Sequence, residues 1–241
     1  MLGWIATHSR KLLIVFAVVV AVLLIAEAFA VRQDNSTIGT QAHNFHSGPY
    51  LSIGFQLSYE SSAPPDAGPV GRFLDFAHRY TGKATSASWQ PFTTQSLKCW
   101  NIADAIALSE NLRNTHSLPI GTLSVHYTFI DGYDCSSKFI AGATYSATST
   151  IIFMPALSNC GILNSGCTAD PVAEAAALSH EFGHMMGLCA IAMPDLSPAV
   201  CDGTGHALDP ASLMASQLDL ASPNVIDLTL EPNEVRLLNE L

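Results

Sequence analysis

The fold is decided by the stretch LSHEFGHMMGLCAIAMPD, residues 178–195, which contains His180 and His184 with Glu181 between them. On an α-helix four residues advance by about 400°, so the two imidazoles lie about 40° apart and one turn apart in height. Both can therefore reach one metal ion. Glu181 leaves the helix beside them, where a carboxylate can polarise a water molecule rather than ligate the metal. The pattern predicts a zinc site on a helix.

This helix has its own start and stop signals. Asp170 can cap the free amides, Pro171 suits the first helical position, and VAEAAALSHEFGHMM follows at residues 172–186. Gly187 can end the helix in a left-handed conformation. Two histidines at this spacing also occur as ordinary core or surface residues, so the pentapeptide alone is a signal of moderate specificity.

A zinc enzyme needs a third protein ligand, and Ala190 stands where the commonest continuation of the motif has a histidine. The turn at Gly187 lets the chain come back towards the same ion. His206 is the only histidine after His184, and no glutamate occurs between His184 and Glu231. A thermolysin-like site, which takes a glutamate from the helix that follows, therefore finds no such residue in this interval. Three aspartates remain as alternatives to His206: Asp195, Asp202 and Asp209.

HEFGHMMGL and the later HALDPASLM together resemble the two halves of a matrixin-type metzincin active site, separated by an insertion. In that family the third histidine follows the glycine by three residues, and a methionine eight residues further on forms a turn beneath the metal. His206 and Met214 keep this second spacing, whereas 18 residues, 188–205, stand where the family has two. Cys189 and Cys201 bracket most of the excess.

The resemblance implies a zinc endopeptidase in which Glu181 is the general base and Met214 supports the site from the turn. His180, His184 and His206 are the zinc ligands that it implies. Calcium is compatible with the resemblance but has no motif of its own, because no acidic cluster has the spacing of a calcium loop.

The resemblance extends more weakly outward, over residues 85–241. AGATYSATSTIIFMP, residues 141–155, resembles the edge strand and preceding loop that flank the cleft in matrixins, and LEPNEVRLLNEL, residues 230–241, resembles their final helix. The implied fold is an α+β, metzincin-like zinc peptidase domain with a mixed sheet, an active-site helix and a C-terminal helix.

Periodicity and turn residues also predict α+β organisation, with most strands before the Asp170 helix. Strands are expected within residues 50–60, 121–132 and 149–155, and helices within 70–80, 101–114 and 231–241. The expected division is an N-terminal segment 1–30, a polar spacer 31–70 that contains the strand at 50–60, and a zinc peptidase domain 71–241.

Residues 1–30 have the anatomy of an export signal, because Arg10 and Lys11 precede an unbroken apolar run from Leu12 to Ala26. The run is long for a cleaved signal peptide and slightly short for a membrane anchor, and both readings stay open. Either one places the rest of the chain outside the cytoplasm, secreted or held at the membrane by this segment.

The chain has six cysteines, all after this segment, which favours disulfides in an exported protein. Six cysteines allow 15 pairings, so connectivity is open. Short-range closure favours the pairs Cys160–Cys167 and Cys189–Cys201, which leaves Cys99 with Cys135.

The formal net charge is −10, and −11 without residues 1–30, which contain Arg10, Lys11 and Glu27 as their charged side chains. No basic run remains that could bind phosphates, so nucleic acid is excluded as a partner. The expected function is an exported zinc endopeptidase that hydrolyses protein or peptide substrates. The alternatives are a non-catalytic, zinc-stabilised extracellular binding module and an anchored protein whose histidines bind no metal.

Overall fold

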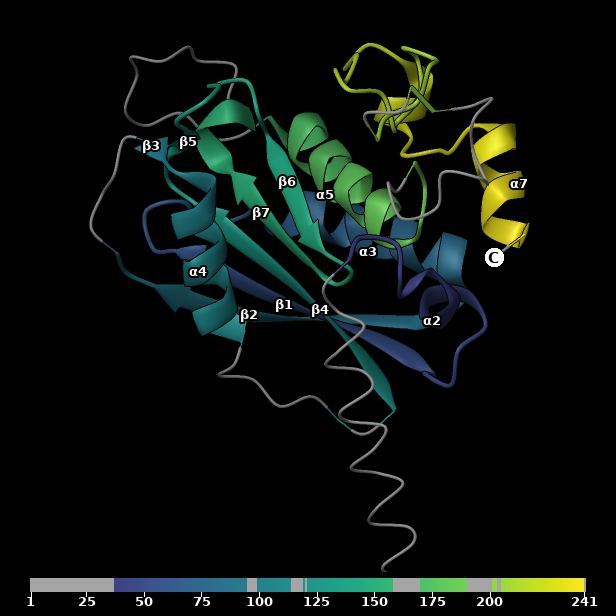
Figure 1. Ribbon diagram of the computed structural model, residues 1–241, viewed down its shortest axis with the longest axis horizontal. Helices are drawn as coiled ribbons and strands as arrows, with labels where there is room; N and C mark the ends of the chain where they lie inside the picture. Colours follow the sequence, from purple (N-terminus) through teal and green to yellow (C-terminus); the bar gives the residue numbers. More distant parts are fainter. Residues whose placement is uncertain are drawn as a thin grey trace, which may run out of the picture. The chain divides into compact units, whose positions relative to one another are not determined.

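A computed structural model describes residues 37–94, 99–113, 119, 121–157, 170–189, 201–202 and 205–240 (Figure 1). These residues belong to one compact unit, Thr37–Leu241. The predicted signal or anchor at residues 1–30 lies outside the described residues. Within the described part of the chain, no helix combines the length and the apolar character that a membrane span requires.

The unit is built on a five-stranded sheet with the order β2-β1-β4-β7-β6. The first four strands in this order are parallel, and β6 pairs with β7 in the antiparallel direction at the edge. The strands are β1 Ser52–Glu60, β2 Ala84–Phe92, β4 Thr122–Ile130, β6 Gly142–Ser146 and β7 Ser149–Phe153. A separate parallel pair joins β3 Cys99–Trp100 to β5 Tyr133–Asp134.

Helices lie on both faces of this sheet (Figure 1). The two long helices α3 and α5 pack against one another, and α4 contacts β1, β4 and β7. The helices are α2 Ala42–His46, α3 Ala67–Thr81, α4 Ile102–Arg113, α5 Pro171–Met185, α6 Pro223–Ile226 and α7 Pro232–Glu240, and a 3₁₀ turn covers Met154–Leu157.

An aromatic cluster forms the core between the sheet and the helices α3 and α5. Phe55 of β1 lies edge-on to Phe73 of α3 and Phe182 of α5, with ring centroids 4.8 and 5.4 Å apart, and Tyr127 of β4 lies 5.3 Å from Phe73. All four side chains are buried. Strand β4 is buried on both faces, which is why it has a long run of buried positions rather than strict alternation. This packing fixes α5 over the sheet.

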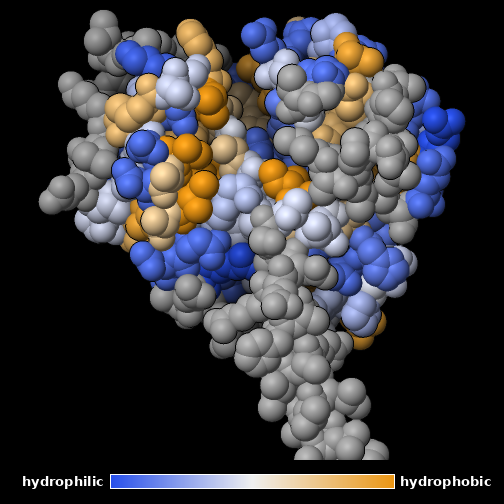
Figure 2. All heavy atoms as spheres, in the orientation of Figure 1, coloured by the Kyte–Doolittle hydropathy of each residue, from blue (hydrophilic) through white to orange (hydrophobic). Residues whose placement is uncertain are grey.

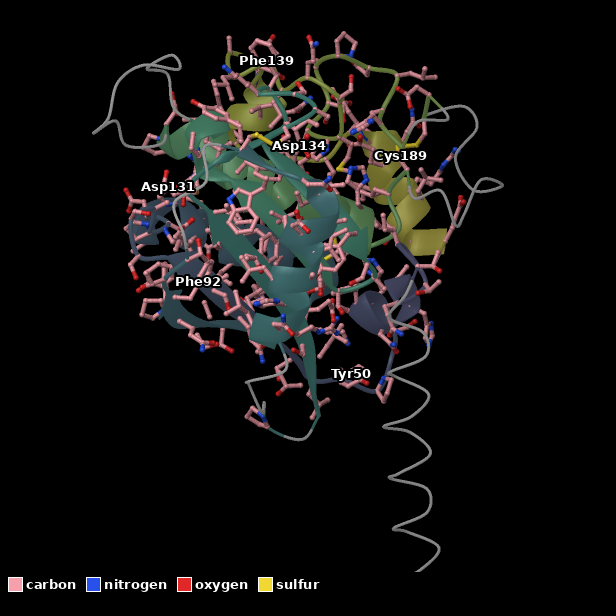
Figure 3. The ribbon with its side chains drawn as sticks, turned by 60° about the vertical axis from the view of Figure 1, so that its left-hand side comes forward. Tyr50, Phe92, Asp131, Asp134, Phe139 and Cys189 are labelled. Carbon is pink, nitrogen blue, oxygen red and sulfur yellow. A yellow bond between two sulfur atoms is a disulfide. The ribbon has the colours of Figure 1, made fainter. Side chains whose placement is uncertain are left out.

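Most large apolar side chains are buried, and on the face shown in Figure 2 hydrophobic and hydrophilic residues are interspersed. Phe139, on the loop between β5 and β6, is the most exposed large apolar residue among those described, at 92% (Figure 3).

The α+β class with a mixed sheet, a long helix that carries His180 and His184, and a C-terminal helix is confirmed. Asp170 caps α5 by accepting hydrogen bonds from the amides of Val172 and Ala173, at 2.8 and 3.3 Å. Gly187 has a φ of 98°, the left-handed conformation expected after the helix.

The N-terminal boundary of the compact unit differs from the expected one at residue 71, since the unit begins at Thr37. Strand β1 lies inside the sheet, between β2 and β4, and both of these partners come later in the sequence. Phe45 of α2 also packs against Phe182, with centroids 5.1 Å apart. Residues 42–60 are therefore part of the packed unit and not of a spacer.

Strand β2 has no counterpart among the expected strands. Its sequence ATSASWQPF consists mainly of small and polar residues, and most of its side chains are exposed or half-buried at the sheet edge. Such a strand lacks the apolar alternation on which prediction depends.

Candidate metal centre

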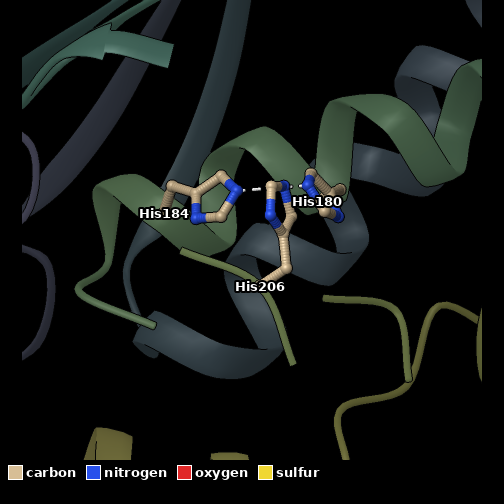
Figure 4. Close-up of side chains that lie close together, drawn as sticks. All are labelled: His180, His184 and His206. Atoms are coloured by element: carbon tan, nitrogen blue, oxygen red, sulfur yellow. Dashed lines mark hydrogen bonds between the residues drawn. The ribbon is translucent and has the colours of Figure 1, made fainter. Parts of the chain in front are cut away.

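The structure brings His180, His184 and His206 together (Figure 4). One ring nitrogen from each lies within 4.8 Å of the others. The ring centroids are 4.7 Å apart for His180 and His184, and 5.5 and 5.4 Å from each of these to His206. The first two come from one face of α5, whereas the third comes from the segment after the helix.

Backbone carbonyls orient two of the imidazoles. Nδ1 of His180 lies 2.8 Å from the carbonyl oxygen of Leu213, and Nδ1 of His184 lies 3.3 Å from that of Leu188. Because a carbonyl can only accept, each Nδ1 carries the proton and each Nε2 keeps its lone pair. The two Nε2 atoms face one another at 3.1 Å (Figure 4). This is the arrangement by which outer hydrogen bonds orient metal-binding histidines.

Met214 is fully buried, and it follows Leu213, whose carbonyl oxygen lies 2.8 Å from Nδ1 of His180. Its Sδ occupies the space beside Gly183, where an added Cβ would lie only 2.3 Å from the sulfur. The Met214 carbonyl accepts a hydrogen bond of 2.8 Å from the amide of Ala207, the residue after His206. The methionine turn is thereby tied both to α5 and to the segment that carries His206.

A disulfide joins Cys189, just beyond α5, to Cys201, with a Cα–Cα distance of 5.5 Å. After it, the amide of Asp202 donates to the carbonyl of His206 at 2.8 Å, and the amide of His206 donates to the Asp202 carboxylate at 3.1 Å. The disulfide and this turn bring His206 back to the helix. Residues 190–200 lie outside the described residues, so their status as an insertion stays a prediction.

Glu181 is buried beside the histidines and points to the edge strand β6. Its Oε2 accepts a hydrogen bond of 2.7 Å from the hydroxyl of Thr144, and the Thr150 hydroxyl lies 3.5 Å from the same oxygen. The carboxylate thus lies between the histidine helix and the edge of the sheet.

The surroundings keep two of the histidines neutral. Burial, together with the neighbouring His180 and His206, holds the pKa of His184 well below its ordinary value, and burial lowers the pKa of His206. Neutral imidazoles have the lone pairs that a metal ion requires.

The alternative third ligands differ in position. Among the described residues, the group that could hold a metal contains neither Asp202 nor Asp209. Both carboxylates instead accept hydrogen bonds from nearby backbone amides, of His206 and Ala211 respectively. Asp195 lies outside the described residues.

The donor set fits zinc. Three imidazole nitrogens with a carboxylate nearby are the groups of a catalytic zinc site, in which a fourth coordination position stays open. Among the described residues, the group that could hold a metal consists of histidines alone, whereas calcium prefers several oxygen ligands.

Comparison with solved structures places this arrangement in context. The crystal structure of an archaemetzincin from Methanopyrus kandleri matches 80% of this chain and 97% of its own, with a TM-score of 0.51 and 16% sequence identity. The fold resembles an archaemetzincin. A second archaemetzincin, from Archaeoglobus fulgidus, has a TM-score of 0.44 and 11% identity over 77% of this chain and 99% of its own. No family model matches the chain, and no curated protein matches it in sequence.

The archaemetzincin likeness is one of fold, and the matrixin subtype stays a prediction from the sequence. Two of the three expected disulfides are present, Cys189–Cys201 and Cys99–Cys135, the latter linking β3 to the residue after β5. The pair Cys160–Cys167 lies outside the described residues.

Several supporting groups were not expected from the sequence. They are the carbonyls of Leu188 and Leu213, and the β6 residues Gly142 and Thr144 that contact Glu181. A sequence does not distinguish one backbone carbonyl from another, and Thr144 lies 37 residues from Glu181 along the chain. Only the resemblance of residues 141–155 to a cleft-flanking edge strand hinted at a role for β6.

Proposed function

We propose that this protein is an exported zinc-dependent endopeptidase of the metzincin class. The observation that carries the proposal is the convergence of three imidazoles with one buried carboxylate, on a fold that resembles an archaemetzincin. A purely structural zinc site needs four protein ligands and no neighbouring base. The proposed ligands are His180, His184 and His206.

In the proposed mechanism, a zinc ion held by His180, His184 and His206 would supply a Lewis acid that acidifies a water molecule and polarises the substrate carbonyl. Glu181 accepts a proton from the attacking water and later donates it to the nitrogen of the departing amine. The carbonyls of Leu188 and Leu213 hold two of the imidazoles in the tautomer that leaves Nε2 available. Met214 packs against α5 at Gly183 and supports the site from the turn, without contacting substrate.

The substrate is proposed to be a protein or peptide, cleaved within the chain. The finer matrixin assignment rests on the spacing of His206 and Met214 and on the similarity of the flanking segments in sequence. Calcium has no support beyond that resemblance.

An extracellular location is part of the proposal. It is supported by the N-terminal segment 1–30, read as a signal peptide or membrane anchor, and by the disulfides Cys99–Cys135 and Cys189–Cys201.

Hydrolysis of a mixed peptide library tests the proposal. The full chain is compared with Glu181→Gln, which keeps the size of the side chain and removes the base. We expect internal cleavage by the wild type and a loss of about 100-fold or more in the variant, with zinc content per chain unchanged. Zinc bound by both proteins without cleavage by either would instead support the non-catalytic binding module. Equal cleavage by both would remove Glu181 from the mechanism.

A further inference from the structure

The Glu181 side chain contacts two residues of the edge strand β6, Gly142 and Thr144. We propose that Thr144 is a positioning residue, which fixes the orientation of the Glu181 carboxylate through its hydroxyl. This inference rests on the peptidase function proposed above, because it concerns the base of that reaction.

The first observation is the hydrogen bond itself. The Thr144 hydroxyl lies 2.7 Å from Oε2 of Glu181 and 3.1 Å from the Glu181 carbonyl oxygen. A hydroxyl has one proton to donate, and the shorter distance and the charge on the carboxylate direct it to Oε2.

The second observation is that two strands converge on this oxygen. Thr144 of β6 and Thr150 of β7 are directly opposite one another in the antiparallel pair. Both hydroxyls approach the same Oε2, at 2.7 and 3.5 Å. Donors gathered on one oxygen distinguish it from Oε1, so the rotation of the carboxylate plane is defined.

The third observation is independent of hydrogen bonding. A Cβ added to Gly142 would lie 2.6 Å from Oε1 of Glu181, 2.8 Å from Cγ and 2.9 Å from Cδ. No larger side chain fits at this position unless Glu181 moves. Gly142 therefore leaves room for the side chain, and Thr144, two residues along the same face of β6, anchors its end.

A base must meet its proton in a defined geometry, and small misplacements reduce the rate of the chemical step. An anchor on Oε2 restricts the carboxylate to one rotation beside the histidines. Loss of the anchor should therefore affect the chemical step more than the binding of substrate.

The test uses the zinc-loaded full chain as wild type, Thr144→Val and Thr144→Ser. Valine has nearly the shape of threonine without the hydroxyl, and serine keeps the hydroxyl. We expect kcat to fall about tenfold in Thr144→Val with KM unchanged, since a hydrogen bond to a charged group is worth roughly one factor of ten or more. Thr144→Ser should recover most of kcat, and zinc content should be equal in all three.

A wild-type kcat in Thr144→Val, or a loss that lies wholly in KM, would overturn the inference. If Thr144→Val does not fold, Gly142→Ala replaces it. The added methyl displaces the carboxylate, so kcat should fall at unchanged zinc content. Full activity of Gly142→Ala would contradict the inference that β6 orients Glu181.

A second readout does not depend on turnover. Acetohydroxamic acid binds zinc as its anion and gives its proton to a nearby carboxylate, so its Kd reports on the placement of Glu181. We expect about tenfold weaker binding to Thr144→Val than to wild type or Thr144→Ser. Should the wild type cleave no peptide, the proposed function fails, and this Kd still decides the role of Thr144: equal values for the three proteins reject it.

Discussion

Gly183 and Met214 are in contact at the base of the histidine cluster. Gly183 lies on α5 between the two helical histidines, and the sulfur of Met214 occupies the space that a side chain at 183 would need. Both partners are buried. The absence of a side chain on the helix therefore lets the methionine turn approach closely, and the Leu213 carbonyl in that turn orients His180.

We expect Gly183→Ala to destabilise the protein by about 1–3 kcal/mol, the usual cost of overpacking a core. Met214→Ala should cost about 2–5 kcal/mol because it leaves a cavity. In the double variant the added methyl has room, so the two costs should not add. Urea unfolding of the four proteins in this cycle measures the coupling; simple additivity would mean that the two residues do not compete for the same space.

At the scale of the elements, α5 is fixed at both ends. Its N-terminal turn meets the start of α3, where the Glu174 carboxylate accepts a hydrogen bond of 2.9 Å from the amide of Asp66, the residue that caps α3. Burial is the main cause that raises the pKa of Glu174 from 4.5 to about 7. The C-terminal end of α5 leads into the Cys189–Cys201 disulfide.

The raised pKa of Glu174 makes stability depend on pH. Between about pH 4.5 and pH 7 the folded protein binds more protons at Glu174 than the unfolded chain does, so this group lowers the free energy of unfolding as the pH rises through that window. Glu174→Gln should therefore stabilise the protein by about 1–3 kcal/mol at pH 8 and much less at pH 5. Urea unfolding at both pH values checks this. Glu240→Gln, an exposed change on α7, is the control, and equal stability of Glu174→Gln and wild type at pH 8 would contradict the assignment.

The disulfide after α5 should lower the cost of holding His206 at the site. In the chain-entropy picture, a disulfide that closes a loop of this length lowers the entropy of the unfolded chain and so stabilises the folded loop by about 3 kcal/mol. Replacing both Cys189 and Cys201 with serine should raise the Kd for zinc about 10- to 100-fold. The matched control replaces Cys99 and Cys135, which form the disulfide between β3 and the residue after β5. Competition with a chromophoric chelator measures each Kd. If removal of either disulfide changed the Kd equally, the Cys189–Cys201 disulfide would have no specific role in holding His206.

For the whole molecule, the sequence predicted what local patterns determine. The spacing of His180 and His184, the Asp170 cap and the Gly187 stop defined α5, and the β4 and β7 runs were long enough to identify. His206 required a resemblance, because 18 residues separate it from Gly187. Strand β2, the place of β1 within the sheet and the contact of Thr144 with Glu181 depend on tertiary pairing, which leaves no local signal in a single chain.

Zinc should stabilise the whole unit, because only the folded chain brings the three histidines together. At a free zinc concentration of about 100 times Kd, binding adds about 2.7 kcal/mol, which corresponds to a rise in Tm of about 5–10 °C for a chain of this size. Calorimetry with and without chelator tests this, and calcium in place of zinc should give no such rise. An unchanged Tm would mean that the folded protein does not bind zinc tightly.

The zinc content per chain after dialysis against a mild chelator tests directly whether the three histidines hold the metal. Wild type, His206→Ala and Asp202→Ala are measured side by side, the last as a control for disturbance of the same turn. We expect about one zinc per chain in wild type and in Asp202→Ala, and far less in His206→Ala. Equal retention of zinc by His206→Ala and wild type would contradict this expectation.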